Sequence, residues 1–289
     1  LGMELQSIQQ AISGIKRVND FLSEPEEDNK QAFEDIGFLC HEVKIAFNHV
    51  TFGYDKDTVI LQDFDLKVEE NKTTTFVGRT GVGKTTTFKL ILGLLKPNQG
   101  EITINGINVI DIPNSKKRQI FGYVNQSVNS INGTVADQIS LGDKSITVQQ
   151  IEDALEFVDL LSYVKSLEHG LQTEVQHDNI FSQGQKQLLA IARAIVTNPP
   201  ILLFDEITSN LDSVSEEKFN NVLKKASGNR TILSISHRLT SIFSADKLVI
   251  IENGKIKNIG TPSELLQNDE WYKARVTMEK LSWNDDFKN

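Results

Sequence analysis

The sequence predicts an α/β fold: a parallel core sheet with an N-terminal antiparallel β subdomain and an inserted α-helical subdomain. A glycine-rich stretch, Gly78–Thr85, stands between a short strand and a helix. The all-apolar run Ile201–Phe204 is typical of a strand that is buried on both faces of a sheet. Residues from 127 to about 180 show helical spacing instead, which predicts the inserted subdomain.

The composition limits the class of protein. Of the 289 residues, 39% are hydrophobic and 24% are charged, which is typical of a globular protein with a buried core. The net charge of −9 argues against nucleic acid as the main partner, because phosphate backbones select basic surfaces. The single cysteine, Cys40, excludes an internal disulfide and a Cys-rich metal site. Because the chain begins at Leu1 rather than methionine, we expect it to belong to a longer protein.

The first hundred residues predict a helix and then strands. Apolar residues three and four positions apart predict an amphipathic helix over residues 1–24, and Pro25 ends it in an acidic linker. Apolar and polar residues then alternate over 43–54 and 58–68, which predicts two β-strands joined by a turn. A short strand over 73–77 leads into the glycine-rich stretch.

The rest of the chain alternates between helices and short strands. Thr147 is a candidate cap for a helical run that extends to Val164. Pro199 must end the helix that opens at Phe181. The other predicted elements are a helix over 85–92, a hairpin over 101–109, a strand over 119–125, a strand over 201–204, a helix over 215–225, a strand over 231–236, a hairpin at Asn253–Gly254 and a helix over 262–266.

The glycine-rich stretch matches the phosphate-binding pattern G-x-x-x-x-G-K-[ST]. Its residues are Gly78, Arg79, Thr80, Gly81, Val82, Gly83, Lys84 and Thr85, followed by Thr86. Between a strand and a helix, backbone N–H groups and the positive end of the helix dipole face one point and favour phosphate. Lys84 would reach the terminal phosphates, and the Thr85 hydroxyl would hold Mg²⁺. A glycine-rich turn before an ordinary helix is the alternative interpretation.

Polar residues also follow three other predicted strands. Asp205 and Glu206 follow one, His237 follows a second and Gln126 follows a third. Open α/β sheets bind ligands at the carboxyl ends of their strands, so we expect these residues to meet the phosphate-binding loop. In nucleotide hydrolysis, Asp205 would hold Mg²⁺ and Glu206 would deprotonate the attacking water. His237 would contact the γ-phosphate, and Gln126 would contact both metal and water.

These motifs resemble the nucleotide-binding domain of ATP-binding cassette (ABC) transporters, over roughly residues 42–266. The resemblance implies a P-loop NTPase core of the RecA-like type that binds and hydrolyses ATP with Mg²⁺. The matching stretches, in chain order, are Tyr54, where the family has an aromatic ring that stacks on adenine; Gly78–Thr85, the Walker A motif; Gln126, the Q-loop; Ile201–Glu206, the Walker B motif with the catalytic glutamate; Ser209–Asp212, the D-loop; and His237, the switch histidine.

The family's signature motif, usually Leu-Ser-Gly-Gly-Gln, stands here as Phe181-Ser182-Gln183-Gly184-Gln185. Phenylalanine replaces leucine, and Gln183 replaces the first glycine. Ser182, Gly184 and Gln185, which in the family meet the γ-phosphate from the opposite subunit, are present. The stretch Thr173–His177 resembles the loop by which exporters meet their membrane helices, but it lacks the usual Gly-Glu pair and is a residue short.

The resemblance implies a head-to-tail dimer, with a second copy or a homologous domain, that encloses two ATP molecules. It implies a domain organisation in which residues 1–27 connect to a transmembrane domain of the transporter, 42–266 form the ATPase domain, about 127–195 form its helical subdomain and 267–289 form a C-terminal tail. We therefore expect the motor domain of an ABC exporter (multidrug, lipid or peptide type) at the cytoplasmic side of the cell membrane.

Three alternatives remain to be weighed. The separate ATPase subunit of an ABC importer usually begins close to the first strand and lacks an N-terminal extension like residues 1–24. An ABC-type ATPase that acts on DNA or ribosomes is disfavoured by the acidic net charge. Its DNA-repair members also have a long coiled coil between Walker A and signature, whereas Gly78 and Ser182 lie only 104 positions apart. A nucleotide-binding module with weak or no turnover is supported by Gln183 and opposed by Glu206 and His237.

Overall fold

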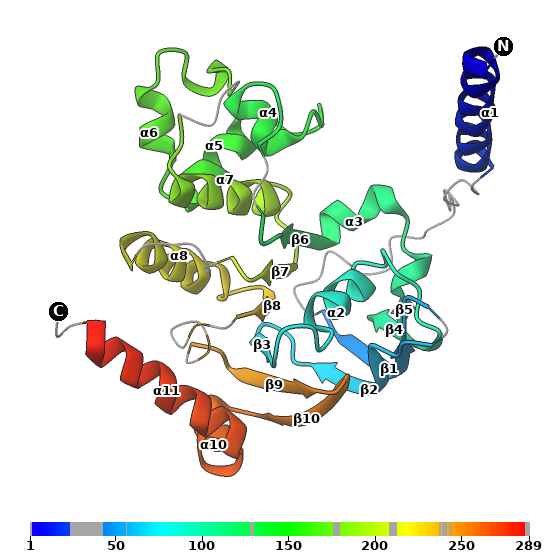
Figure 1. Ribbon diagram of the computed structural model, residues 1–289. Helices are drawn as coiled ribbons and strands as arrows, with labels where there is room; N and C mark the ends of the chain where they lie inside the picture. Colours follow the sequence, from blue (N-terminus) through cyan, green and yellow to red (C-terminus); the bar gives the residue numbers. More distant parts are fainter. Residues whose placement is uncertain are drawn as a thin grey trace. The chain divides into compact units, whose positions relative to one another are not determined.

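The computed structural model describes residues 2–23, 43–55, 57–127, 130–175, 180–207, 213–236, 238, 242 and 244–286. The chain divides into two compact units, Leu1–Ala32 and Phe33–Asn289. The first unit contains helix α1 (Gly2–Leu22), in agreement with the helical spacing of the first 24 residues. All the other helices and strands described below belong to the second unit (Figure 1).

Two sheets form the framework of the second unit. The smaller sheet is antiparallel and has the order β2-β1-β4-β5. The larger one has the order β10-β9-β3-β8-β7-β6, in which β9, β3, β8, β7 and β6 are parallel to one another. The strands are β1 (Ile45–Phe52), β2 (Leu61–Val68), β3 (Thr73–Val77), β4 (Gln99–Ile104), β5 (Ile107–Asn108), β6 (Phe121–Val124), β7 (Ile201–Asp205), β8 (Thr231–Ile235), β9 (Lys247–Glu252) and β10 (Lys255–Gly260).

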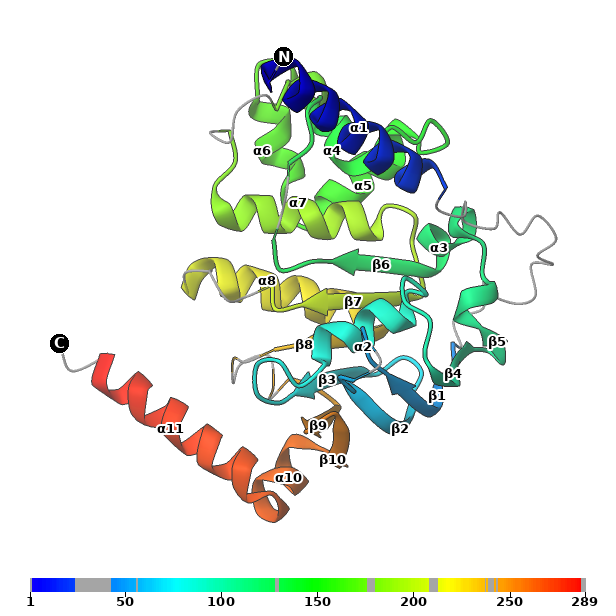
Figure 2. The same cartoon turned by 45° about the vertical axis from the view of Figure 1, so that its right-hand side comes forward.

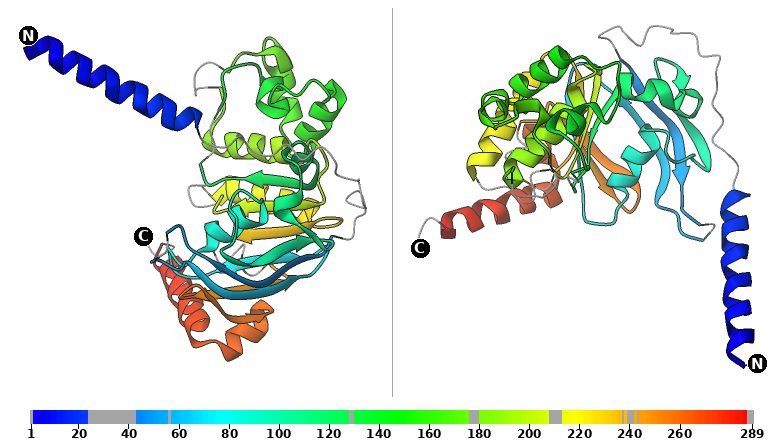
Figure 3. Two further views of the ribbon diagram at one scale, coloured as in Figure 1. Left: turned by 90° about the vertical axis from the view of Figure 1, so that its right-hand side faces the viewer. Right: turned by 90° about the horizontal axis from the view of Figure 1, so that it is seen from above.

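Helices cover the larger sheet and extend past its β6 edge. Helices α4 to α7 gather beyond β6 and pack on one another, and α7 also packs on β6 (Figure 2). Helix α11 lies beside the β9–β10 hairpin (Figure 3) and buries Tyr272 and Val276 there. The helices are α2 (Lys84–Ile91), α3 (Asn114–Ile120), α4 (Val135–Ser140), α5 (Val148–Phe157), α6 (Leu161–Ser166), α7 (Gln183–Ile195), α8 (Ser213–Ala226), α10 (Pro262–Asn268) and α11 (Glu270–Asp286).

Strand β7 is apolar up to its last residue because both of its faces are buried. Ile201 and Leu203 point into the core between the two sheets, whereas Leu202 and Phe204 point into the core that the helices α4 to α8 form. Successive side chains of a strand face opposite sides, so a strand between two cores must be apolar at every position. The first polar residue, Asp205, therefore stands where the strand leaves the core.

The structure corrects two details of the expected elements and adds a helix within the C-terminal tail. The strand expected over 119–125 begins only at Phe121, because residues 114–120 form helix α3. The helix expected over 147–164 begins after the Thr147 cap, as predicted, but it breaks at Asp159, whose φ of 58° is left-handed. The C-terminal tail expected over 267–289 contains helix α11.

The contact between β6 and α7 gives a prediction for stability. A Cβ at Gly122 would lie 2.4 Å from the Ala194 carbonyl oxygen and 2.6 Å from the Leu202 side chain. We expect Gly122→Ala to lower the free energy of unfolding by about 1–3 kcal/mol, because α7 has to move off the sheet. Urea denaturation measures this change. The control is Gly228→Ala, where no heavy atom lies within 4 Å of the added Cβ; equal effects of the two substitutions would contradict the prediction.

Candidate active site

The loop between β3 and α2 encloses the buried ammonium group of Lys84. Gly83 caps α2 with a left-handed φ of 103°, and a Cβ there would lie 2.9 Å from the Leu61 side chain, so the turn requires glycine. The Lys84 ammonium donates to the carbonyl oxygens of Gly78 and Arg79, each at 3.0 Å. Burial lowers the pKa of Lys84, whereas the nearby carboxylates oppose that change. A cation that is 5% exposed and held by neutral carbonyls fits an anionic ligand.

A buried carboxylate lies opposite the loop. Asp205 ends β7 and is 3% exposed. Its Oδ1 accepts from the Thr85 hydroxyl at 3.3 Å, and its Oδ2 accepts from the Tyr123 hydroxyl at 3.4 Å. Burial is the main cause of the raised pKa of Asp205; the Glu206 charge adds to it, and the hydrogen bond from Thr85 opposes it. A carboxylate in these surroundings is stabilised by a cation, so its environment fits a metal ion.

Thr85 and Asp205 fit Mg²⁺ in the presence of a nucleotide. Within the described part of the chain, no three His, Cys, Asp or Glu residues group together as a metal site. Mg²⁺ does not require such a group, since it usually keeps several waters and is bound by one or two protein oxygens together with substrate phosphates. A hydroxyl and a carboxylate at 3.3 Å beside a phosphate-binding loop are donors of that kind.

Glu206 follows β7 in a strained conformation. Its φ of 49° is in the left-handed region, which costs a residue other than glycine about 1–3 kcal/mol. The backbone N–H of Glu206 donates to the Ile235 carbonyl oxygen at 3.0 Å, which anchors this turn to the neighbouring strand β8. The amide of Gln126, just beyond the end of β6, donates to Glu206 Oε2 at 3.2 Å. Two residues expected to meet from neighbouring strand ends are therefore in contact.

The remaining residues of the predicted nucleotide site lie around the start of α2. Arg79, Thr80 and Gly81 are exposed at the tip of the loop, whereas Thr86 is buried. The Tyr54 hydroxyl lies 3.4 Å from the Thr86 hydroxyl. The rings of Tyr54 and Phe52 pack in a T-shaped pair with centroids 5.1 Å apart, yet Tyr54 is 58% exposed. An exposed ring this close to the phosphate-binding helix can stack on a planar ligand.

Three signature residues lie on the helical side of the sheet. Ser182 caps α7: its hydroxyl accepts from the Gln185 N–H at 3.2 Å, while Gln185 Oε1 accepts from the Ser182 N–H at 2.8 Å. Gly184 belongs to the same first turn. Helix α7 packs on β6, three strand positions from β3, or roughly 14 Å at the usual strand spacing. Helix α7 and the phosphate-binding loop thus adjoin different strands of the larger sheet.

Some predicted residues cannot be placed. His237, Asp212 and the Ser209–Asp212 stretch lie outside the described residues, as do Gln176 and His177 of the Thr173–His177 stretch. Their roles stay predictions.

Sequence reasoning missed Tyr123, which donates to Asp205 from the neighbouring strand. The signal was a hydroxyl near the carboxyl end of an otherwise apolar strand. Tyr123 pairs with Leu203, two residues before Asp205, so the contact depends on β6 lying beside β7. Burial raises the pKa of Tyr123, and the Asp205 charge raises it further, so the phenol stays protonated and acts as a donor.

Comparison with known proteins agrees with this geometry. The family model described as ABC transporter matches residues 61–209, which is half of the chain and includes the phosphate-binding loop, Gln126 and Glu206. This chain belongs to the ABC transporter family. The family resemblance and the fold class predicted from the sequence, a P-loop NTPase core with β and helical subdomains, are confirmed.

Relatives of this ABC transporter chain include exporters from several bacteria. The ATP-dependent lipid A-core flippase of Pasteurella multocida is 39% identical over 79% of this chain and 40% of its own length. A putative multidrug export ATP-binding/permease protein of Staphylococcus aureus is 37% identical over 82% of this chain and 42% of its own length. A solved structure, a bacterial Atm1-family ABC exporter with ATP bound, matches 97% of this chain and 49% of that chain, with a TM-score of 0.81 and 28% identity.

The ABC transporter chain thus spans less than half the length of these relatives. Among the helices that the structure describes, none is both long enough and apolar enough to cross a membrane.

Proposed function

We propose that this chain is the ATP-binding and ATP-hydrolysing motor domain of an ABC exporter. The observation that carries the proposal is the meeting of Lys84, Asp205, Glu206 and Gln126 at the carboxyl ends of parallel strands. A cation for phosphates, a carboxylate for a metal ion and a second carboxylate for water are the groups that phosphoryl transfer to water requires.

Lys84 and the loop backbone bind the phosphates. In the structure the Lys84 ammonium donates to two neutral carbonyls of the loop. Bound ATP replaces those acceptors with charged phosphate oxygens, which make shorter and stronger hydrogen bonds. The N–H groups at the start of α2 add to the attraction, and Tyr54 stacks on the adenine. Thr85, Asp205 and Gln126 would hold Mg²⁺, which would supply positive charge beside the phosphates.

Glu206 acts as the base. The oxygen of a water molecule bonds to the γ-phosphorus, and one proton of that water passes to Glu206. The bond between the γ-phosphorus and the bridging oxygen breaks, which releases ADP. Gln126 supports this role because its amide hydrogen bond at 3.2 Å orients the Glu206 carboxylate. His237 contacts the γ-phosphate and the water.

A second nucleotide-binding domain, an identical copy or a homologue, completes each site. The position of α7 on the edge strand β6 supports this arrangement, because Ser182, Gly184 and Gln185 begin a helix that packs three strand positions away from β3, the strand that leads into their own phosphate-binding loop. In a head-to-tail dimer these residues contact the γ-phosphate bound by the partner, and the D-loop resemblance assigns Asp212 to nucleotide binding as well. ATP bound between the two domains stabilises the dimer, which separates after hydrolysis.

We expect turnover per chain to rise with protein concentration, since a site made from two chains forms only in the dimer. Phosphate release is measured with saturating ATP and Mg²⁺ over a wide range of protein concentrations. Ser182→Ala is the matched variant: the hydroxyl that it removes caps α7 and, in this proposal, contacts nucleotide only in the partner's site, so ATP binding to the chain's own loop should be unchanged while turnover falls. A turnover per chain that is constant down to low concentration would exclude the shared site.

The dimer cycle drives the transmembrane domain of the transporter. The relatives named as a lipid A-core flippase and as a multidrug export ATP-binding/permease protein support an exporter at the cytoplasmic side of the cell membrane. In this proposal α1 connects the ATPase domain to the membrane helices.

The replacement of the first signature glycine by Gln183 favours one second candidate, a module that binds ATP with little turnover. Measured phosphate release distinguishes the two candidates.

A further inference from the structure

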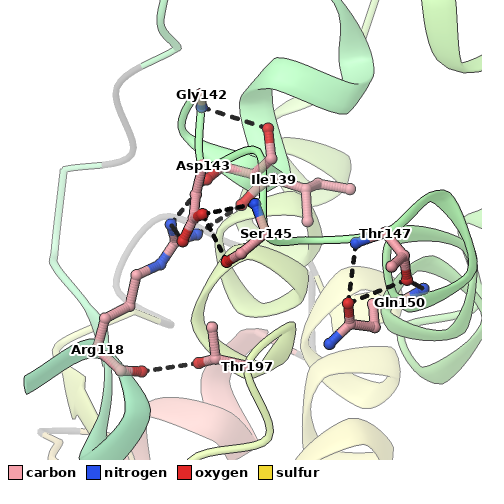
Figure 4. A network of polar contacts seen from close by, with 9 residues as sticks. Arg118, Ile139, Gly142, Asp143, Ser145, Thr147, Gln150 and Thr197 are labelled. Atoms are coloured by element: carbon pink, nitrogen blue, oxygen red, sulfur yellow. Dashed lines mark hydrogen bonds and ion pairs between the residues drawn. The ribbon is translucent and has the colours of Figure 1, made fainter. Parts of the chain in front are cut away.

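Helix α4 ends with its carbonyl groups bonded to an arginine of another subdomain. The last carbonyls of an α-helix have no partner within the helix. Arg118 lies on α3, and its guanidinium donates to the Ser140 carbonyl oxygen at 2.7 Å and to the Ile139 carbonyl oxygen at 3.0 Å (Figure 4). Asp143 lies 3.7 Å from the same guanidinium. The side chain of Arg118 is 29% exposed, so these bonds are largely shielded from water.

A second arginine holds the preceding carbonyl of α4 from within the helical subdomain. Arg193 of α7 donates to the Gln138 carbonyl oxygen at 2.6 Å. The buried Gln138 side chain in turn accepts from the Ile131 N–H at 3.0 Å and donates to the Ile131 carbonyl oxygen. The end of α4 is thereby tied to the segment that follows Gln126, and Arg193 fastens it to α7.

Of these two arginines, Arg118 is the one that crosses between subdomains. It lies on the helix that leads directly into β6, and β6 leads to Gln126. Its own carbonyl oxygen accepts from the Thr197 hydroxyl at 2.7 Å, just beyond the end of α7. Arg118 is thus bonded to α4 through its side chain and to the end of α7 through its main chain (Figure 4).

We propose that Arg118 is a positioning residue of the ATP site. By holding the ends of α4 and α7 against α3 and β6, it sets the orientation of the helical subdomain on the sheet. That orientation places Gln126 beside Glu206 and presents Ser182, Gly184 and Gln185 to the partner's site. The role rests on the proposed function, because these residues matter to a reaction only if ATP is hydrolysed.

The test compares Arg118→Lys with Arg193→Lys in the full chain. Lysine keeps the positive charge but lacks the planar fork that donates to two carbonyls at once. Both substitutions weaken the same helix end, but among the bonds shown for the described residues only those of Arg118 join α4 to the helix that leads into β6. For Arg118→Lys we expect kcat to fall about 10-fold or more, since small displacements of catalytic groups are costly, with an unchanged Kd for ATP. We expect both variants to lower Tm by a similar amount. For Arg193→Lys we expect kcat to stay unchanged.

A distance measurement reads the orientation without any turnover. Spin labels replace the exposed Lys89 of α2 and Glu156 of α5, with Cys40→Ser as the background. We expect one narrow distance distribution in the otherwise unchanged chain and in Arg193→Lys, and a broader or shifted one in Arg118→Lys. Thr197→Val removes the other bond to Arg118 with little change of shape, so it gives a smaller change in the same direction even if Arg118→Lys does not fold.

The outcomes separate this role from the proposed function. Identical distances and equal changes in kcat for the two arginine variants would overturn the positioning role. A chain that releases no phosphate without any of these substitutions would instead refute the proposed function, and the label distances would still test Arg118.

Discussion

Replacing Glu206 by glutamine is expected to stop ATP turnover while ATP binding persists. The amide has nearly the shape of the carboxylate and still accepts the hydrogen bond that Gln126 donates at 3.2 Å, so the site stays assembled. It cannot take a proton from water, and loss of a general base lowers the rate about 10²- to 10⁴-fold. Phosphate release from the purified chain measures the loss, and equilibrium ATP binding measures what remains.

The same variant should accumulate as a dimer with ATP and Mg²⁺, because the step that separates the two domains is blocked. Gel filtration with and without ATP shows this. Glu217→Gln is the matched control, since Glu217 is an exposed glutamate on α8. Phosphate release at the unaltered rate from the Glu206 variant would show that another group activates the water.

Lys84→Ala is expected to weaken ATP binding about 10- to 100-fold. A hydrogen bond to a charged group contributes about 1.5–3 kcal/mol, and each 1.4 kcal/mol is about tenfold in affinity. The loss should be larger for ATP than for AMP, which has no β- and γ-phosphates for the ammonium to reach. Calorimetric titration gives the four affinities that the comparison needs: ATP and AMP, each to the unaltered chain and to Lys84→Ala.

A control on the same helix separates this contact from the general charge of the region. Lys89→Ala removes an exposed ammonium from the last turn of α2 and should leave ATP affinity unchanged. Equal affinities of the Lys84 and Lys89 variants would mean that the buried ammonium does not bind phosphate.

The carboxyl ends of the strands explain what the sequence could predict. An apolar strand with a polar residue directly after it places that residue at the sheet's edge, and this local pattern identified Asp205, Glu206 and Gln126. The glycine pattern identified the loop because the need for positive φ limits Gly83 to one residue type. Each of these signals lies within a few residues of the group that it locates.

Contacts between elements far apart in the chain leave no comparable signal. Tyr123 meets Asp205 only because β6 lies next to β7, and the order of strands in a sheet is not written in any one segment. Arg118 resembles an ordinary surface arginine until α4 is placed over it. The break at Asp159 was missed because apolar spacing continues across it, and α11 was missed because its apolar residues show little periodicity.

Position 206 also shows where the demands of folding and chemistry diverge. A chain chosen only for its ability to fold would have glycine at this tight corner, since glycine alone adopts the local backbone shape without penalty. The acid that stands there instead is aimed by that shape. At this one residue the protein tolerates a backbone conformation of higher free energy, which holds a reactive carboxylate in a fixed direction.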